Sequence, residues 1–248
     1  MNLRIATEKH IIPAGRYSTL YDNMANQTHL LIAGRTGSGK SCVVNGIIHS
    51  QLVQKSCAEI QFIFIDPKRV ELSQWKNIPH CIAYASDDER ERLNALYLAV
   101  RIIEHRFEEM EAQGIKKYNG SDILVIIDEL ADLLTTQKND VLPLLQRIGQ
   151  IGRAARVHLI ACTQCPTAQI LSTQLRCNFD SILGLRTRSP QDSRNIIGIK
   201  GCEKLPDHGQ GYYVTPKSEG IEDLPLIPES DLNAVASHWT NRSQYVAV

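Results

Sequence analysis

The chain has 248 residues, 43% of them hydrophobic and 22% charged, a composition that excludes disordered and fibrous proteins. Lysine plus arginine equals aspartate plus glutamate at 27 each, so any basic surface must be local. The sequence contains no signal-peptide pattern, no regular cysteine framework and no apolar run of the roughly 18 residues that cross a bilayer. We therefore expect a cytoplasmic protein without a membrane span.

Strand-like and helix-like segments alternate along the chain, which predicts an α/β fold with a mainly parallel sheet flanked by helices. The expected strands are His29–Ala33, Ile60–Ile65, Ile123–Ile127, Val157–Cys162 and Ser181–Leu185, with an edge strand or hairpin at Gly209–Val214. The expected helices are Ser41–Val53, Asp88–Gln113, Val141–Ile151 and a tail helix near Asp231–Trp239. These elements suggest a lead-in segment (1–28), one large domain (29–217), and a linker with a C-terminal tail (218–248).

A glycine-rich segment between the first strand and the first helix carries the clearest chemical signal. It matches the eight-residue P-loop pattern and consists of Gly34, Arg35, Thr36, Gly37, Ser38, Gly39, Lys40 and Ser41. The glycines let successive backbone N–H groups and the helix N-terminus face phosphate oxygens. We expect Lys40 to reach the β- and γ-phosphates of ATP and Ser41 to bind Mg²⁺.

Two carboxylates follow the apolar strand Ile123–Ile127, at the end where ligands bind in open α/β sheets. Asp128 is expected to hold Mg²⁺, and Glu129 to act as the general base for the attacking water. A strand followed by Asp-Glu is a weak signal alone. Its position about ninety residues after the P-loop makes it strong.

Three further residues could complete the catalytic site. Gln164 follows the strand Val157–Cys162, where it could sense the γ-phosphate, although an ordinary turn would look the same. Arg153 and Arg156 precede that strand, and either could reach across a subunit interface to stabilise the transferring phosphoryl group. The residues alone do not decide between the two arginines.

The chain resembles the motor domain of the FtsK/SpoIIIE family of DNA translocases from His29 to about Val214. The resemblance is carried by a series of segments in a fixed order. They are His29–Gly34 leading into the P-loop, Ile65-Asp66-Pro67-Lys68 with Glu71-Leu72, Ile78-Pro79-His80, Asp128–Leu133, Gly152–Ala155, Thr163-Gln164 and Asp192-Ser193-Arg194.

This resemblance implies a RecA-like P-loop ATPase fold and a hexameric ring of identical subunits around double-stranded DNA, with ATP sites between subunits. It favours Arg153 as the interface arginine, because Gly152–Ala155 matches the family motif, whereas Arg156 stands where the family usually has glycine. Family positions that face the DNA correspond to Arg176 and Arg194. At a third such position this chain has Pro190, and Arg188 lies two residues earlier. This departs from the family pattern.

The charges between Arg176 and Lys204 agree with a DNA-binding role, since six basic residues face three acidic ones there. Contacts of this kind go to phosphates and are insensitive to sequence. We expect them on the flank of the sheet opposite the ATP site. The main hypothesis is an ATP-driven duplex-DNA translocase, either a minimal motor or a fragment of a longer protein, and the alternative is an ATPase of a protein-secretion system.

Overall fold

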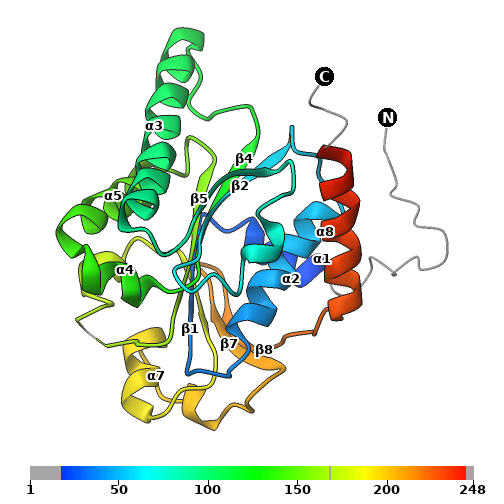
Figure 1. The fold of residues 1–248 in the computed structure, drawn as a ribbon. Coiled ribbons are helices and arrows are strands. Elements are labelled where there is room, and N and C mark those ends of the chain that lie inside the picture. Colours follow the sequence, from blue (N-terminus) through cyan, green and yellow to red (C-terminus); the bar gives the residue numbers. More distant parts are fainter. Residues whose placement is uncertain (1–17, 168, 244–248) are drawn as a thin grey trace.

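The computed structural model describes residues 18–167 and 169–243. It has an eight-stranded sheet in the order β3-β2-β4-β5-β1-β6-β7-β8, in which the first six strands are parallel and β7 and β8 are antiparallel (Figure 1). The strands are β1 (His29–Ala33), β2 (Ile60–Ile65), β3 (Cys81–Ala85), β4 (Asp122–Ile127), β5 (Val157–Thr163), β6 (Ser181–Gly184), β7 (Gln210–Val214) and β8 (Glu219–Asp223). The predicted α/β class with a mainly parallel sheet is confirmed.

Helices cover both faces of this sheet. They are α1 (Ser18–Ala25), α2 (Lys40–Leu52), α3 (Glu89–Gln113), α4 (Leu130–Thr136), α5 (Lys138–Ile151), α6 (Thr173–Arg176), α7 (Pro190–Ile197) and α8 (Glu229–Ser243), with the 3-10 turns η1 (Ser73–Trp75) and η2 (Cys202–Lys204). Figure 1 shows α1, α2 and α8 on one face, and α3, α4 and α5 on the other. Among these described helices, none is long and apolar enough to cross a membrane.

The central strands are apolar on both sides, as parallel strands between two helical layers must be. In β4, Leu124 and Ile126 pack toward α2, whereas Ile123, Val125 and Ile127 pack toward α3 and α5, and all five are buried. This double burial explains why the strands appear in the sequence as short continuous apolar runs. Because these strands are parallel, their carboxyl ends lie along one edge of the sheet.

The edges of the sheet differ from the sequence-based expectation. Strand β3 is absent from the sequence-based prediction. Its sequence Cys-Ile-Ala-Tyr-Ala is short, includes two alanines, which are depleted in strands, and lies half-buried at one edge of the sheet. Strand β8 lies within the predicted linker and is also missed from sequence, since glutamate, glycine and aspartate are depleted in strands. Pairing with β7 holds β8 in place.

Segments on both sides of the predicted large domain pack against α2. Tyr21 of α1 is buried against Gly46, and its hydroxyl donates to the carbonyl of Pro225. The indole Nε1 of Trp239 in α8 donates to the carbonyl of Leu52, 3.0 Å away. These flanking elements therefore share the hydrophobic core of the sheet.

Candidate nucleotide-binding site

The P-loop connects β1 to α2 at the carboxyl edge of the sheet. Gly39 caps α2 with a left-handed backbone (φ 94°), a conformation in which side chains with a Cβ are strained. Gly34 has no room for a side chain, because a Cβ there would approach Ser38 Oγ and Leu185 Cβ to 2.6 and 2.7 Å. The loop can therefore wrap closely, and the first turn of α2 leaves backbone N–H groups without intrahelical acceptors.

Lys40 is the first residue of α2, and its side chain is folded back onto the P-loop. Its Nζ donates to the carbonyl oxygens of Gly34 and Arg35, both at 2.9 Å. Burial lowers the pKa of Lys40, and the nearby carboxylates of Glu129 and Asp128 partly oppose that shift. The ammonium group therefore contacts only backbone carbonyls of the loop through the hydrogen bonds described, and it could exchange these for a bound phosphate.

Several carboxylates gather at the ends of β2 and β4. Burial and the charges of Asp66 and Glu71 raise the pKa of Asp128 to about 7. Asp66 is fully buried: its Oδ2 accepts from the N–H of Leu72 at 3.0 Å, and its Oδ1 has no partner among the described residues. Crowded oxygen ligands that disfavour each other's charge are a suitable setting for a hard divalent cation.

Glu129, Gln164 and the P-loop are joined by direct contacts. Glu129 is buried, and its Oε1 accepts from the N–H of Gln164 at 3.2 Å and from the N–H of Ala131 at 3.3 Å. The amide Oε1 of Gln164 accepts from Thr36 Oγ1 at 2.6 Å. Because β5 lies between β1 and β4, Gln164 bridges the phosphate loop and the carboxylate predicted to be the general base.

A charged rim surrounds the outer side of the P-loop. Asp207 pairs with Arg35 and with Arg186, 3.3 Å from Nη1 of the latter. These hydrogen-bonded and charged partners lower the pKa of Asp207. His208 follows it, with Nδ1 3.7 Å from the point where a Cβ of Gly39 would lie. The segment after η2 thus leans over the start of α2.

The residues predicted to contact DNA lie around α6 and α7. Arg188 is exposed and lines a small pocket of about 120 Å³ together with Arg35 and Gln164. It is therefore beside the candidate nucleotide site, which contradicts the expectation of an opposite flank. Arg176 donates to the carbonyl of Asn195 at 3.2 Å and so ties α6 to α7, while Arg194 is exposed and contacts Gln191 in its own helix.

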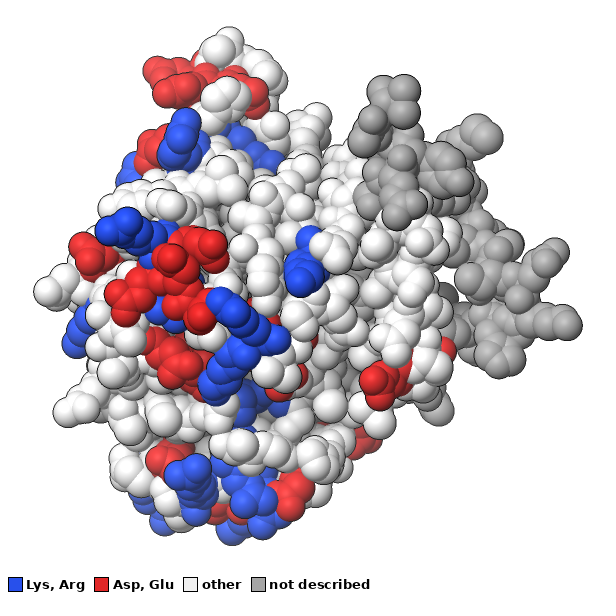
Figure 2. Space-filling model, in the orientation of Figure 1, with Lys and Arg blue, Asp and Glu red and all other residues white. Residues whose placement is uncertain are grey.

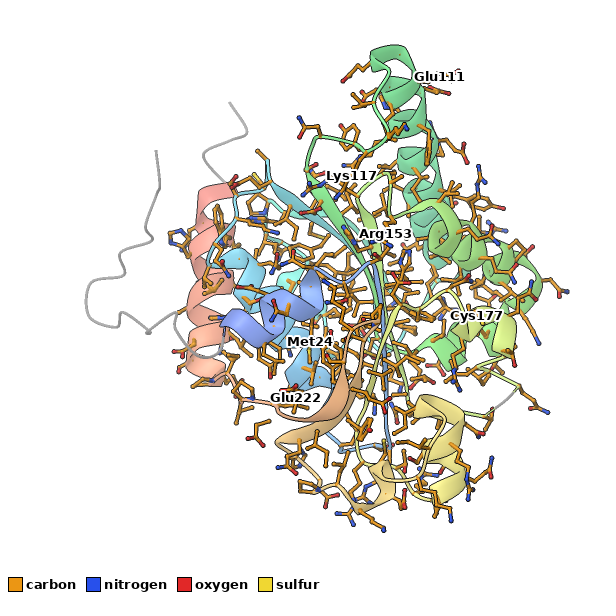
Figure 3. All side chains as sticks on the ribbon, turned by 180° about the vertical axis from the view of Figure 1, so that it is seen from behind. Met24, Glu111, Lys117, Arg153, Cys177 and Glu222 are labelled. Carbon is orange, nitrogen blue, oxygen red and sulfur yellow. The ribbon has the colours of Figure 1, made fainter. Side chains whose placement is uncertain are left out.

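Arg153 lies far from the P-loop of its own chain. It is exposed in the turn between α5 and β5, at the amino end of the strands, and Figure 3 shows it near the loop that carries Lys117. Strand β5 alone, with seven residues, separates the two ends by about 20 Å. Within one chain, Arg153 cannot reach the P-loop.

Arg156 lies in the same turn, and its role, which the sequence left open, is to pair with a carboxylate of its own chain. Its backbone is left-handed (φ 56°), the conformation in which glycine is favoured. Its guanidinium binds both carboxylate oxygens of Asp122, at 2.8 and 2.7 Å. Burial alone would raise the pKa of Asp122. Hydrogen bonds from His158 and Arg156 outweigh this effect and hold that pKa well below its usual range.

Sequence analysis gave no role in the site to three of its residues: Asp66 and Lys68 were noted only as part of a family motif, and Asp207 was not noted. Asp66 follows the apolar strand β2 just as Asp128 follows β4, so the strand-end argument could have found it. Lys68 lies 3.8 Å from Glu129, and Asp207 pairs with Arg35 from a position 172 residues later in the chain. Local patterns contain no signal for contacts of such separation.

Comparisons with known proteins show the family of the chain. The FtsK/SpoIIIE family model matches residues 4–122 and 119–168. The DNA translocase FtsK of Streptomyces avermitilis is 33% identical over 241 residues, which cover 87% of this chain and 27% of that protein. The chain thus spans about a quarter of that relative's length.

Two solved structures share the fold. The cytoplasmic domain of the Thermomonospora curvata type VII secretion ATPase EccC superposes with a TM-score of 0.73 at 22% identity, over 86% of this chain and 28% of EccC. The pCW3 conjugation coupling protein TcpA with ATPγS gives 0.74 at 16% identity, over 87% of this chain and 66% of TcpA. The family match and the P-loop architecture together identify the chain as a member of the FtsK/SpoIIIE family.

Proposed function

We propose that this chain is an ATPase that uses hydrolysis to move double-stranded DNA. The observation that carries the ATPase proposal is the chain of contacts from Thr36 in the P-loop through Gln164 to Glu129. These contacts join the P-loop, a polar strand-end residue and a buried carboxylate, and this arrangement supports the proposal. Nucleotide binding is also supported by the solved structure of TcpA, which contains ATPγS.

In this proposal the P-loop backbone and Lys40 bind the phosphates of ATP, while Ser41 and Asp128 hold Mg²⁺. The metal would neutralise charge on the phosphate oxygens. The raised pKa of Asp128, caused by its burial and by the charges of Asp66 and Glu71, fits such a cation, because the cation would favour the ionised form of Asp128. Glu129 then accepts a proton from the attacking water, and Gln164 responds to the terminal phosphate.

The position of Arg153 supports action in a ring. Since this arginine is exposed and lies at the end of the sheet away from its own P-loop, it could serve only the nucleotide of a neighbouring copy. An arginine supplied across an interface stabilises the charge of the transferring phosphoryl group. We therefore propose a homo-oligomer, in the form of a hexameric ring.

Duplex DNA is proposed as the substrate on two grounds: the relatives named as DNA translocases, and the basic residues near α7. Figure 2 shows Lys and Arg side chains at the lower end of the molecule, with Asp and Glu side chains among them, and this is the end where α7 lies in Figure 1. The basic residues between Arg176 and Lys204 include Arg188 and Arg194, both exposed. The competing substrate is a secreted polypeptide, as the likeness to EccC allows.

Duplex DNA and a secretion substrate can be separated by measuring ATP hydrolysis and DNA affinity together. We expect double-stranded DNA to stimulate hydrolysis and its affinity to fall steeply with salt, with Arg194→Ala lowering the log–log salt slope by roughly one unit. Arg101→Ala, which changes an exposed arginine of α3, is the matched control and should leave the slope unchanged. Stimulation by unfolded polypeptide with no response to DNA would favour the secretion reading.

A further inference from the structure

Lys68 is the partner of the one oxygen of Glu129 that backbone groups leave free. The two N–H donors of Ala131 and Gln164 both contact Oε1 of Glu129. Its Oε2 faces Lys68, with Nζ 3.8 Å away. A general base needs an accessible oxygen for the proton of water, so Lys68 forms an ion pair with the oxygen that would accept this proton if Glu129 is the base.

The loop around Lys68 is fixed by contacts that do not involve its side chain. The N–H of Leu72 donates to Asp66 Oδ2 at 3.0 Å, and the N–H of Arg69 donates to the carbonyl of Asp66 at 3.1 Å. Arg69, whose backbone is left-handed, pairs with Asp87. The Lys68 side chain is 44% exposed, so its ion pair contributes little to folding and its long stem can move.

Lys68 also lies close enough to Lys40 for its charge to lower the pKa of that residue. Two ammonium groups therefore point into the region between the P-loop and the end of β4. Both ammonium groups have partners that a phosphate could replace. Lys40 donates to two backbone carbonyls, and Lys68 pairs with Glu129. A triphosphate entering this region would offer each of them a more strongly charged acceptor.

We propose that Lys68 is a phosphate-responsive positioning residue for Glu129. Without a triphosphate it pairs with Glu129 Oε2; with ATP bound it transfers to the terminal phosphate and frees that oxygen. Water oxygen then attacks the γ-phosphorus, the bond from this phosphorus to the bridging oxygen breaks with its electron pair passing to ADP, and the water proton passes to Glu129 Oε2. This proposal rests on the proposed function, in which Glu129 is the base.

The test compares the dissociation constants of AMPPCP and ADP, measured with Mg²⁺ by displacement of a fluorescent nucleotide. Lys68→Met should weaken AMPPCP about fivefold and leave ADP unchanged, since only the terminal phosphate recruits the lysine. Glu129→Gln should tighten AMPPCP by a similar factor, because no ion pair must be broken. In the double variant Glu129→Gln should have no further effect, since Lys68 is already absent.

Two other variants separate this role from a structural one. Lys68→Arg keeps the charge and should retain most of the AMPPCP preference, and Lys76→Met changes an exposed lysine outside the site and should match the wild type. Equal AMPPCP-to-ADP ratios in wild type and Lys68→Met, with unchanged melting temperatures, would overturn the proposal. So would equal tightening by Glu129→Gln in both backgrounds. If the wild type binds neither nucleotide, the proposed function fails as well.

Discussion

The two ends of the parallel sheet are held together in different ways. At the carboxyl end, polar side chains make contacts that a ligand could replace, such as Lys40 with two backbone carbonyls, Glu129 with Lys68 and Thr36 with Gln164. At the amino end, the turn that carries Arg153 is braced from several sides. Arg106 donates to the carbonyl of Ala155 at 2.7 Å and to Ser121 Oγ at 3.1 Å.

The same turn is also bound by the N–H of Tyr118, which donates to the carbonyl of Ala154 at 2.9 Å, and by the pair of Arg156 with Asp122. The contrast suggests a division of labour. Residues proposed to bind a nucleotide can exchange their present contacts for contacts with it at little cost in free energy. The arginine proposed to act on a neighbouring copy lies in a turn that several hydrogen bonds and an ion pair hold in place. Changes at one end should therefore affect nucleotide chemistry, and changes at the other should affect stability or assembly.

The largest effects are expected at the carboxyl end. Lys40→Ala should abolish nucleotide binding, because the loop loses its only lysine. Glu129→Gln should bind ATP and slow hydrolysis by roughly 10²- to 10⁴-fold, as expected when a general base is removed. Equilibrium binding and steady-state phosphate release measure the two separately. Normal turnover by Glu129→Gln would show that another group activates water.

Arg153→Ala should retain ATP affinity and lose hydrolysis by roughly 10³-fold or more, the scale of an arginine that acts on the transferring phosphoryl group. Because Arg153 lies far from the P-loop of its own chain, the proposed role places its target nucleotide in a neighbouring copy. Mixing Arg153→Ala with Glu129→Gln should restore part of the activity at mixed interfaces. If the two variants are shown to co-assemble and no mixture recovers, action between subunits is wrong.

Stability should depend on the buried titratable groups at the amino end, beginning with His29. Burial, assisted by the charge of His158, lowers the pKa of His29 to about 4, and Nδ1 accepts from the N–H of Leu159 at 3.0 Å, which requires an unprotonated ring. The unfolded chain binds this proton near pH 6.5 and the folded chain only near pH 4. The free energy of unfolding should therefore fall by about 3 kcal/mol as pH drops through that window.

Urea unfolding at pH 7, 5.5 and 4.5 measures this dependence. His29→Asn keeps a hydrogen-bond acceptor and removes the titration, so its stability should be lower at pH 7 but should decline less toward pH 4.5. His105→Asn changes an exposed histidine of α3 and should keep the wild-type decline. Parallel curves for wild type and His29→Asn would exclude His29 as a source of the acid sensitivity.

The turn itself offers a smaller and more specific test. Asp122→Asn leaves Arg156 and Lys55 without their carboxylate and should cost about 2 kcal/mol of unfolding free energy. Arg156→Ala loses the ion pair and keeps the left-handed backbone. Arg156→Gly loses the same pair but relieves strain of about 1 kcal/mol, so it should be the more stable of the two. Equal stability of these variants would contradict the strain argument.

How much could be predicted from the sequence depends on whether a feature is local. The P-loop and the Asp128-Glu129 pair are coded within short segments that follow buried strands, and the structure brings them together. The pairs Arg156–Asp122 and Lys68–Glu129 join residues 34 and 61 positions apart, so no local pattern reports them. Strand β8 depends on β7 for its pairing, which is why its polar sequence was interpreted as a linker.

The smallest expected effect concerns Asp207, whose pairs with Arg35 and Arg186 are half-exposed. Breaking exposed ion pairs changes free energies only slightly, because solvent screens them. Because Asp207 places a negative charge beside the phosphate loop and occupies Arg35, Asp207→Asn should tighten ATP binding by about two- to threefold. Asp223→Asn, an exposed change on β8, is the matched control.

Ionic strength sharpens this test, because salt screens exposed charges over a distance of about 10 Å at 0.1 M. The gain in Asp207→Asn should therefore shrink as salt rises, whereas the consequences of Lys40→Ala should not. Weaker ATP binding in Asp207→Asn would reverse the assignment. It would mean that the pair with Arg35 shapes the P-loop for the nucleotide, so that this part of the carboxyl end is braced like the amino end.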